Sequence, residues 1–272
     1  MITEKEQEAI VLRVEREGAL AILTIDDQDT RNALSAALTR QLVRACADIN
    51  ADMSVGCAIL TGAGDVFCAG GNIKDMYARA NHFAGNAAEF RRSYLSGVQS
   101  IARAIYDLEV PIIAAVNGPA SGAGMDFATM CTLRIASQRA WFAESFIKLG
   151  LTSAAGGAWF LTRAIGQQRA AEMALTGDSI SAGEAVELGL ILKAVPHETL
   201  LDEARALAAR ITRHPMHSIR LNTRLLRESG RLDVHASLEM AAAMQAIVQQ
   251  TDDQHEAVAA VIESRAPNFS GR

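Results

Sequence analysis

Residues 110–126, VPIIAAVNGPASGAGMD, decide the fold of this chain. The apolar run Val110–Val116 has the length and composition of a strand that is buried on both faces. Asn117-Gly118-Pro119 ends it, and the small residues 121–124 turn the chain into a short helix over 125–130. An apolar strand followed by a tight turn and a helix is typical of a parallel sheet, so we predict an α/β fold.

The same pattern occurs once more, upstream. Val55–Thr61 is an apolar strand, and the glycine-rich loop FCAGGN over 67–72 follows it. Two such turns at the carboxyl ends of neighbouring strands can lie side by side, where open α/β sheets bind ligands. Backbone N–H groups near Gly71 and Ala123 would then converge on an anion and form an oxyanion hole. Considered alone, the turns are better explained as tight connections that require glycine.

The rest of the chain divides into two regions. Short β-rich runs at 9–16 and 19–26 predict a hairpin, and Ser35 is placed to cap a helix whose apolar residues recur at helical spacing. From about residue 198 to 264 the pattern is helical without strand signals. We therefore predict a β/α core over 1–195 and a helical region over 196–272.

Composition excludes several classes of function. The 272 residues are 50% hydrophobic, and the net charge of −5 argues against non-specific binding to nucleic acid or to anionic membranes. The four cysteines lack metal-site spacing, and the amino-terminal residues lack the apolar segment of a signal peptide. No apolar run is long enough to span a bilayer. We expect a soluble cytoplasmic protein with reduced, mostly buried thiols.

Two segments resemble landmarks of a known family. Residues 67–76, FCAGGNIKDM, are similar to the F-x-A-G-A-D-I-K-x-M segment of the crotonase (enoyl-CoA hydratase/isomerase) superfamily. Residues 111–126 resemble its P-x-I-A-A-V-N-G-x-A-x-G-G-G-x-E segment. Further similar stretches lie at 31–34, 175–178 and 264–269, in the family's order and across nearly the whole chain.

The resemblance implies a spiral of ββα units with a helical C-terminal trimerisation region, assembled as a homotrimer or a dimer of trimers. It implies an acyl-CoA substrate, with coenzyme A present only as part of that substrate and without a metal or redox cofactor. Carried over by position, the oxyanion-hole donors are the N–H groups of Gly71 and Ala123. The implied coenzyme A contacts are Arg31, Ala69, Asn72, Ile73 and, from a neighbouring subunit, Phe269.

The chain departs from the family at one of two catalytic carboxylates. The first aligns with Asp126, which is shorter than the usual glutamate, and the second aligns with Phe146. Glu144 would face the same cavity as residue 146 if this segment were extended. The burial statistics of glutamate instead favour a solvated or salt-bridged surface side chain for Glu144. Asp126 also has a structural alternative, in which it only stabilises the helix dipole.

These residues favour an enoyl-CoA hydratase or isomerase in which Asp126, with or without Glu144, moves a proton. The alternatives are a single-carboxylate isomerase, a CoA-thioester hydrolase, a decarboxylase, or a catalytically weak CoA-binding member of the family. One scaffold hosts many reactions, so the fold does not choose among them. The acyl substrate depends on residues 76–100 and 141–160, where the resemblance is weakest.

Overall fold

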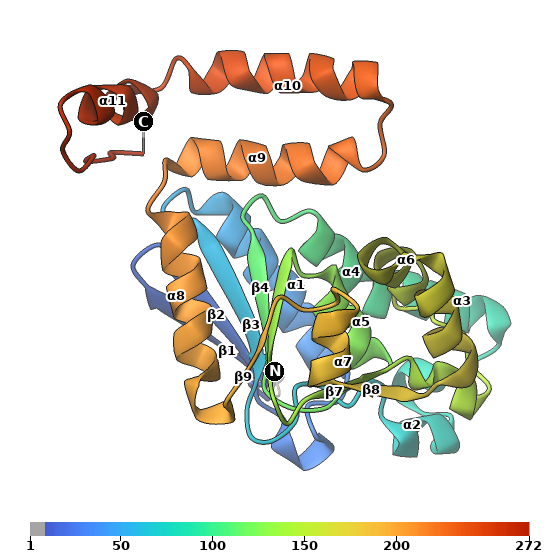
Figure 1. Ribbon diagram of the computed structural model, residues 1–272. Coiled ribbons are helices and arrows are strands. Elements are labelled where there is room, and N and C mark those ends of the chain that lie inside the picture. Colours follow the sequence, from blue (N-terminus) through green and yellow to red (C-terminus); the bar gives the residue numbers. More distant parts are fainter. Residues whose placement is uncertain (1–8, 272) are drawn as a thin grey trace, which may run out of the picture.

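A six-stranded sheet forms the centre of the protein, whose computed structural model describes residues 9–271 (Figure 1). Its strand order is β1-β2-β3-β4-β6-β9, with β1 antiparallel to β2 and every other pair parallel. The strands are β1 (Leu12–Glu17), β2 (Leu20–Ile25), β3 (Cys57–Gly62), β4 (Ile112–Val116), β6 (Leu133–Ser137) and β9 (Ala194–Val195). The predicted hairpin and parallel α/β sheet are confirmed.

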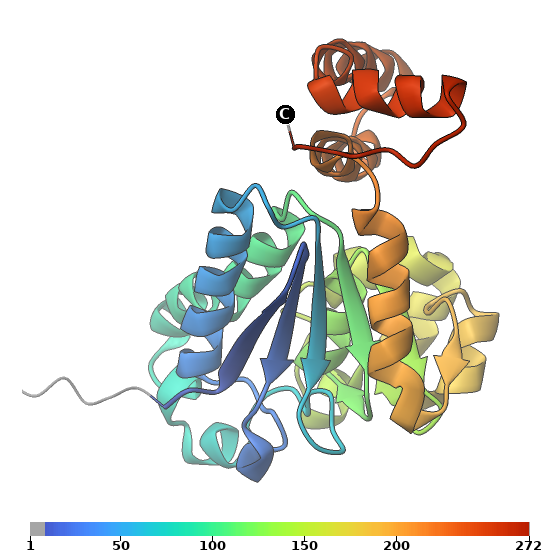
Figure 2. The same cartoon turned by 90° about the vertical axis from the view of Figure 1, so that its left-hand side faces the viewer.

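Helices cover both faces of this sheet, which explains why its central strands are apolar throughout. All six residues of β2 and all five of β4 are buried. On one face lie α1 (Ala36–Ala51) and α4 (Val98–Tyr106), and on the other lies α8 (Leu200–Thr212). Figure 2 shows the sheet between α1 and α8. Ser35 caps α1 as predicted, because its side chain accepts a hydrogen bond from the N–H of Leu38 at 3.1 Å.

A second layer of short elements is built on the carboxyl ends of the strands. A three-stranded sheet consists of β5 (Ala120–Ser121), β7 (Trp141–Ala143) and β8 (Ser179–Ser181). The helices of this layer are α2 (Ile73–Ala78), η2 (Asn81–Phe83), α3 (Ala87–Ser96), α5 (Ala123–Met130), η3 (Ser145–Leu149), α6 (Gly157–Thr176), α7 (Ala182–Glu187) and η4 (His197–Thr199), with η1 (Gln28–Thr30) after β2. Gly97, with a φ of −97° and a ψ of −111°, separates α3 from α4 (Val98–Tyr106).

The chain leaves this body after α8. Helices α9 (Met216–Ser229), α10 (Val234–Val248) and α11 (Asp252–Ile262) extend away from the sheet, as Figure 1 shows. Arg220 holds α9 to the core: it is 5% exposed, it pairs with Glu109 at 2.8 Å, and it donates to backbone carbonyls such as that of Asp52 at 2.6 Å. The helical pattern predicted for 196–272 is confirmed, although its first helix, α8, packs on the sheet. The division at residue 195 stays a prediction.

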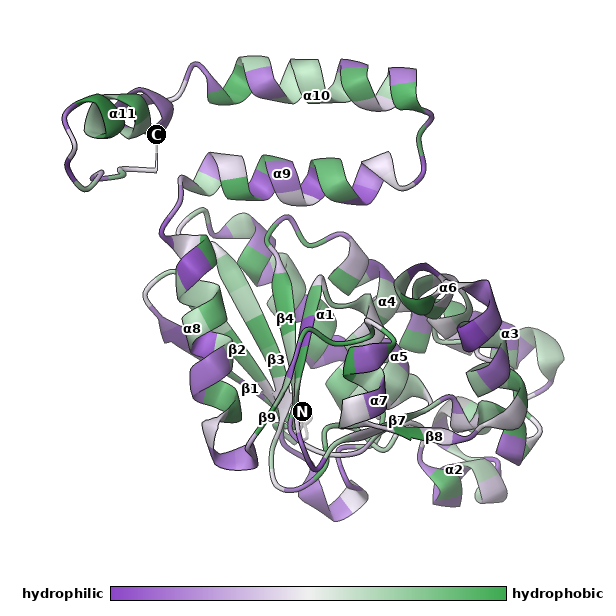
Figure 3. Cartoon of the chain, in the orientation of Figure 1, coloured by the Kyte–Doolittle hydropathy of each residue, from purple (hydrophilic) through white to green (hydrophobic). Residues whose placement is uncertain are grey.

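Helix α10 has no buried residue within this chain, yet its mean hydropathy is high. Figure 3 shows apolar residues along α10 and α11. The side chains of Val234, Leu238 and Ile247 in α10 are exposed. Across residues 9–271, no helix combines the length and the apolar composition that crossing a membrane requires.

Candidate active site

The two small-residue turns lie directly against each other, as their positions after β3 and β4 predict. The N–H of Ser121 donates to the carbonyl of Cys68 at 3.1 Å, and Cys68 also forms a parallel bridge with Ala120. A Cβ atom on Gly124 would lie only 2.0 Å from that same carbonyl oxygen. Glycine at 124 is therefore required by the close approach of the two backbones.

The N–H groups of Gly71 and Ala123 both lack a backbone hydrogen-bond partner among the described residues. Their neighbours are engaged, because the carbonyl of Gly70 accepts from Leu34 at 2.7 Å and the N–H of Gly122 donates to Ala143 at 2.8 Å. Ala123 is the first residue of α5, where the N–H precedes the helical hydrogen-bond ladder and the helix dipole favours negative charge. The pair can stabilise an oxyanion.

Gly71 and Ala123 line one small cavity of about 20 Å³. Its other described lining residues are mostly apolar, and only Ser93 and Tyr94 contribute hydroxyl groups. Phe146 is part of the wall, so the aromatic residue at the family's carboxylate position faces this cavity. The remaining lining residues are Leu34, Met76, Phe83, Val98 and Leu151. The cavity as it stands has room for about one water molecule, and its mostly apolar lining next to the two N–H donors is of the kind that binds an acyl chain.

A buried pair of carboxyl groups lies one turn further along α5. Asp126 and Glu144 are 0% and 1% exposed, and their side chains meet at Gly157, the first residue of α6. A Cβ atom on Gly157 would lie 2.1 Å from Asp126 Oδ1, 2.4 Å from Glu144 Oε1 and 2.6 Å from Ser153 Oγ. The two carboxyl oxygens are thus separated by no more than the sum of the first two distances. The site exists because residue 157 has no side chain.

Burial and mutual repulsion govern the protonation of this pair. Desolvation raises the pKa of Asp126 well above its usual range, the neighbouring charge and hydrogen bond of Glu144 raise it further, and the Gly157 N–H lowers it. Desolvation also raises the pKa of Glu144, against hydrogen bonds with Asp126 and Ser153 that lower it. These contacts are loose, because none of the four carboxyl oxygens has a partner at hydrogen-bond geometry among the described residues. A single shared proton would remove the repulsion and join two of the oxygens by a hydrogen bond.

The expectation that Glu144 is a surface residue is wrong. The premise that 144 and 146 lie on one extended segment is also wrong, because β7 ends at Ala143 and Glu144 immediately precedes the 3-10 helix η3. The chain turns there, so Phe146 enters the cavity wall and Glu144 faces Asp126. Glutamate is rarely buried unless it is paired, and no short-range pattern reveals a partner on another helix. Ser153 beside the pair was not predicted.

The residues expected to contact coenzyme A form a rim beside Gly71, with one exception. Arg31 is exposed and in the left-handed region with a φ of 60°, and its carbonyl accepts from the N–H of Ala69 at 3.1 Å. Asn72 caps α2, and Ile73 is 63% exposed. Phe269 instead belongs to the tail that follows α11. Figure 1 shows this tail on the side of the molecule that carries α9 and α10. Within one chain it does not join the rim.

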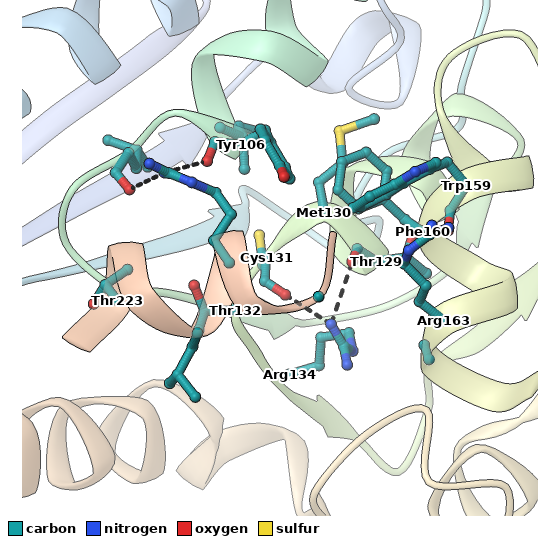
Figure 4. A pocket seen from close by; sticks show the side chains of 16 residues that line it. Tyr106, Thr129, Met130, Cys131, Thr132, Arg134, Trp159, Phe160, Arg163 and Thr223 are labelled. Carbon is teal, nitrogen blue, oxygen red and sulfur yellow. Dashed lines mark hydrogen bonds between the residues drawn. The ribbon is translucent and has the colours of Figure 1, made fainter. Parts of the chain in front are cut away.

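A separate cavity of about 320 Å³ lies between α4, α6 and α9 (Figure 4). It contains aromatic rings and arginines, with the Arg163 guanidinium 3.8 Å from the centre of the Trp159 ring and Arg227 near Tyr106. None of its described lining residues is acidic, and it shares no residue with the cavity at Gly71. It offers no acid–base pair.

The cysteines do not contribute nucleophiles. All four are free and buried, as the sequence predicts. Burial raises the pKa of each thiol to about 12, so each stays protonated at neutral pH. The chemical groups that remain at this candidate site are the two N–H donors and the carboxyl pair.

Comparison with known proteins identifies the family of this chain. A sequence model of the enoyl-CoA hydratase/isomerase family matches residues 15–272. The chain belongs to the enoyl-CoA hydratase/isomerase family. A probable enoyl-CoA hydratase of Rhodobacter capsulatus is 34% identical over 96% of this chain and 98% of its own length. The 1,2-epoxyphenylacetyl-CoA isomerase of Escherichia coli is 32% identical over 94% of this chain and 97% of its own length.

Solved structures of family members confirm the predicted crotonase-like fold. The enoyl-CoA hydratase of Bacillus anthracis superimposes with a TM-score of 0.90 at 30% identity, over 97% of this chain and all of that one. Because hydratases and an isomerase are similar to this chain at nearly equal identity, the choice between the two reactions depends on its own site residues.

Proposed function

We propose that this family member hydrates short 2-enoyl-CoA thioesters reversibly, with Asp126 and Glu144 as its acid–base pair. The observation that carries the proposal is the buried contact of these two carboxyl groups. Hydration removes a proton from water and delivers one to C2 of the acyl group. Two carboxyl groups that share one proton provide a base and an acid at the same time.

The proton balance is closed over one turnover. The ionised carboxylate of the pair takes a proton from water as the water oxygen bonds to C3. The C2–C3 π electrons move toward the thioester, whose oxygen carries the developing negative charge between the N–H groups of Gly71 and Ala123. The protonated carboxyl group then supplies the proton to C2. The pair again holds one proton, as it did before the reaction.

The surroundings of the pair support this function. Glu144, Ser153 and Gly157 border a further cavity of about 340 Å³ along α6, which offers water an approach that the acyl group does not occupy. Arg31 and the exposed start of α2 at Asn72 and Ile73 suit a coenzyme A molecule that enters beside Gly71. Among the relatives, the 2,3-dehydroadipyl-CoA hydratase of Escherichia coli is 31% identical over 96% of this chain.

The test is a panel of 2-enoyl-, 3-enoyl-, β-keto- and malonyl-type CoA thioesters with product identification, on the wild type and on Asp126→Asn and Glu144→Gln. We expect hydration of crotonyl-CoA and a loss of at least about a hundredfold in either variant, the lower end of a general acid–base contribution. Full activity in both variants would overturn the acid–base assignment. Turnover of 3-enoyl-CoA alone would replace hydration by isomerisation, and release of free coenzyme A would replace it by hydrolysis.

We propose further that α10 and α11 mediate assembly into a homotrimer or a dimer of trimers. An apolar helix without a buried residue in its own chain requires a covering surface. In such an assembly Phe269, remote from the rim of its own subunit, would reach the coenzyme A of a neighbour. Light scattering of the wild type and of Leu238→Glu tests this, and a wild type that is monomeric at micromolar concentration contradicts it.

A further inference from the structure

Tyr94 is a polar residue of the acyl cavity for which neither the sequence motifs nor the acid–base pair accounts. It lies on α3 and lines the same cavity as Gly71, Ala123 and Phe146. Its ring is packed 5.0 Å from that of Phe90, which in turn lies 6.3 Å from the ring of Phe83. This row of aromatic rings fixes the position of the phenol.

The hydroxyl group of Tyr94 has no hydrogen-bond acceptor among the described residues. It makes no hydrogen bond to any residue within 9–271. Desolvation and the charge of nearby Asp126 raise the pKa of Tyr94, so the phenol stays protonated and is a donor at neutral pH. A hydroxyl group that lines a cavity and has no partner in the protein is free to bind a ligand in that cavity.

Phe146 stands where the family has a carboxylate, so the water of the reaction needs another hydrogen-bonding partner, and Tyr94 can be that partner. At the position where the family places its second carboxylate, the cavity wall here is an aromatic ring that cannot hold water. The water that adds at C3 must still be oriented while the pair removes its proton. Of the described residues that line the cavity, only Ser93 and Tyr94 have side chains that can hydrogen-bond an oxygen. Tyr94 has the longer side chain of the two, and its ring is held in place by its contact with Phe90.

We propose that the phenol O–H of Tyr94 donates a hydrogen bond to the oxygen at C3 of the acyl group, which is the adding water in one direction and the leaving hydroxyl in the other. This inference rests on the proposed function. Tyr94 keeps its proton throughout: the bonds that change are the O–C3 bond and the two proton transfers of the acid–base pair. Its contribution is orientation of the water and recognition of the 3-hydroxyacyl product.

The test compares two ligands that differ by this oxygen. We would measure the dissociation constants of 3-hydroxybutyryl-CoA and butyryl-CoA by calorimetry on the wild type and on Tyr94→Phe. Loss of one neutral hydrogen bond should weaken binding of the hydroxy ligand roughly three- to tenfold and leave butyryl-CoA unchanged. Unchanged butyryl-CoA binding also shows that the variant is folded. With crotonyl-CoA we expect kcat to fall and KM to stay within about twofold.

Tyr106→Phe is the matched control, because its buried hydroxyl also lacks a partner among the described residues but borders the separate cavity at α9. It should leave both dissociation constants unchanged. Equal affinities of wild type and Tyr94→Phe for the hydroxy ligand would overturn the role of Tyr94 while the proposed function stands. A wild type that binds neither thioester would instead refute the proposed function.

Discussion

Gly157→Ala tests whether the carboxyl pair depends on a missing side chain. The added methyl group would lie 2.1 Å from Asp126 Oδ1, 2.4 Å from Glu144 Oε1 and 2.6 Å from Ser153 Oγ, all far inside van der Waals contact. Alanine at the first residue of α6 would gain no more than about 0.5–1 kcal/mol from helix propensity. Overpacking a filled site costs about 1–3 kcal/mol, so we expect net destabilisation.

The effect on activity should exceed the effect on stability. The three oxygens must move away from the new methyl group, and a displacement of about 1 Å from a productive geometry can cost on the order of a hundredfold in rate. The assay is crotonyl-CoA hydration at saturating substrate, together with the melting temperature, which should fall by about 2–4 °C for each kcal/mol lost.

Gly183→Ala is the control for this experiment. Gly183 lies within α7, where an added Cβ atom would approach its nearest neighbour only to 3.8 Å. This variant should keep its activity and gain about 0.5–1 kcal/mol in stability. The reasoning is refuted if Gly157→Ala hydrates crotonyl-CoA within about twofold of the wild-type rate while the control behaves as expected.

Three further predictions follow from the same contacts. Burial raises the folded-state pKa of Asp126 above the unfolded value of about 3.9, so the folded protein binds this proton more tightly and loses stability as pH rises from about 4. Asp126→Asn lacks this titration, so the free energy of unfolding of the wild type, measured in urea, should fall relative to that of the variant between pH 5 and 8. An equal pH dependence of the two proteins would show that the pKa of Asp126 is not raised. Gly124→Ala places a methyl group 2.0 Å from the carbonyl oxygen of Cys68, which belongs to the backbone and has little freedom to move. Both kcat and the melting temperature should therefore fall. Unchanged values would show that the two turns are not in contact. Arg220→Met leaves backbone carbonyls without their hydrogen-bond donor. The free energy of unfolding in urea should fall by about 1–3 kcal/mol, and kcat should stay unchanged. An unfolding midpoint equal to that of the wild type would show that Arg220 does not hold α9.

The sequence by itself determined the sheet, the turns and the helical end of the chain. Apolar runs such as Val110–Val116 have one stable environment, which is the centre of a covered sheet. The small residues at Gly124 and its neighbours signal a close backbone approach, and here that approach occurs between two turns that the motifs also identify. Caps such as Ser35 act within a few residues, so local sequence is sufficient to place them.

Only the tertiary structure decided how the acid–base groups are arranged. Periodicity tells which face of an element is apolar, but it does not tell which distant side chains meet. Glu144 is buried because the chain turns after β7, because Asp126 approaches from α5, and because Gly157 leaves space between them. The position of Tyr94 depends likewise on the packing of α3 over the cavity. Each of these contacts joins elements that only folding brings together, and the burial of a charged group is favourable only once its partner is there.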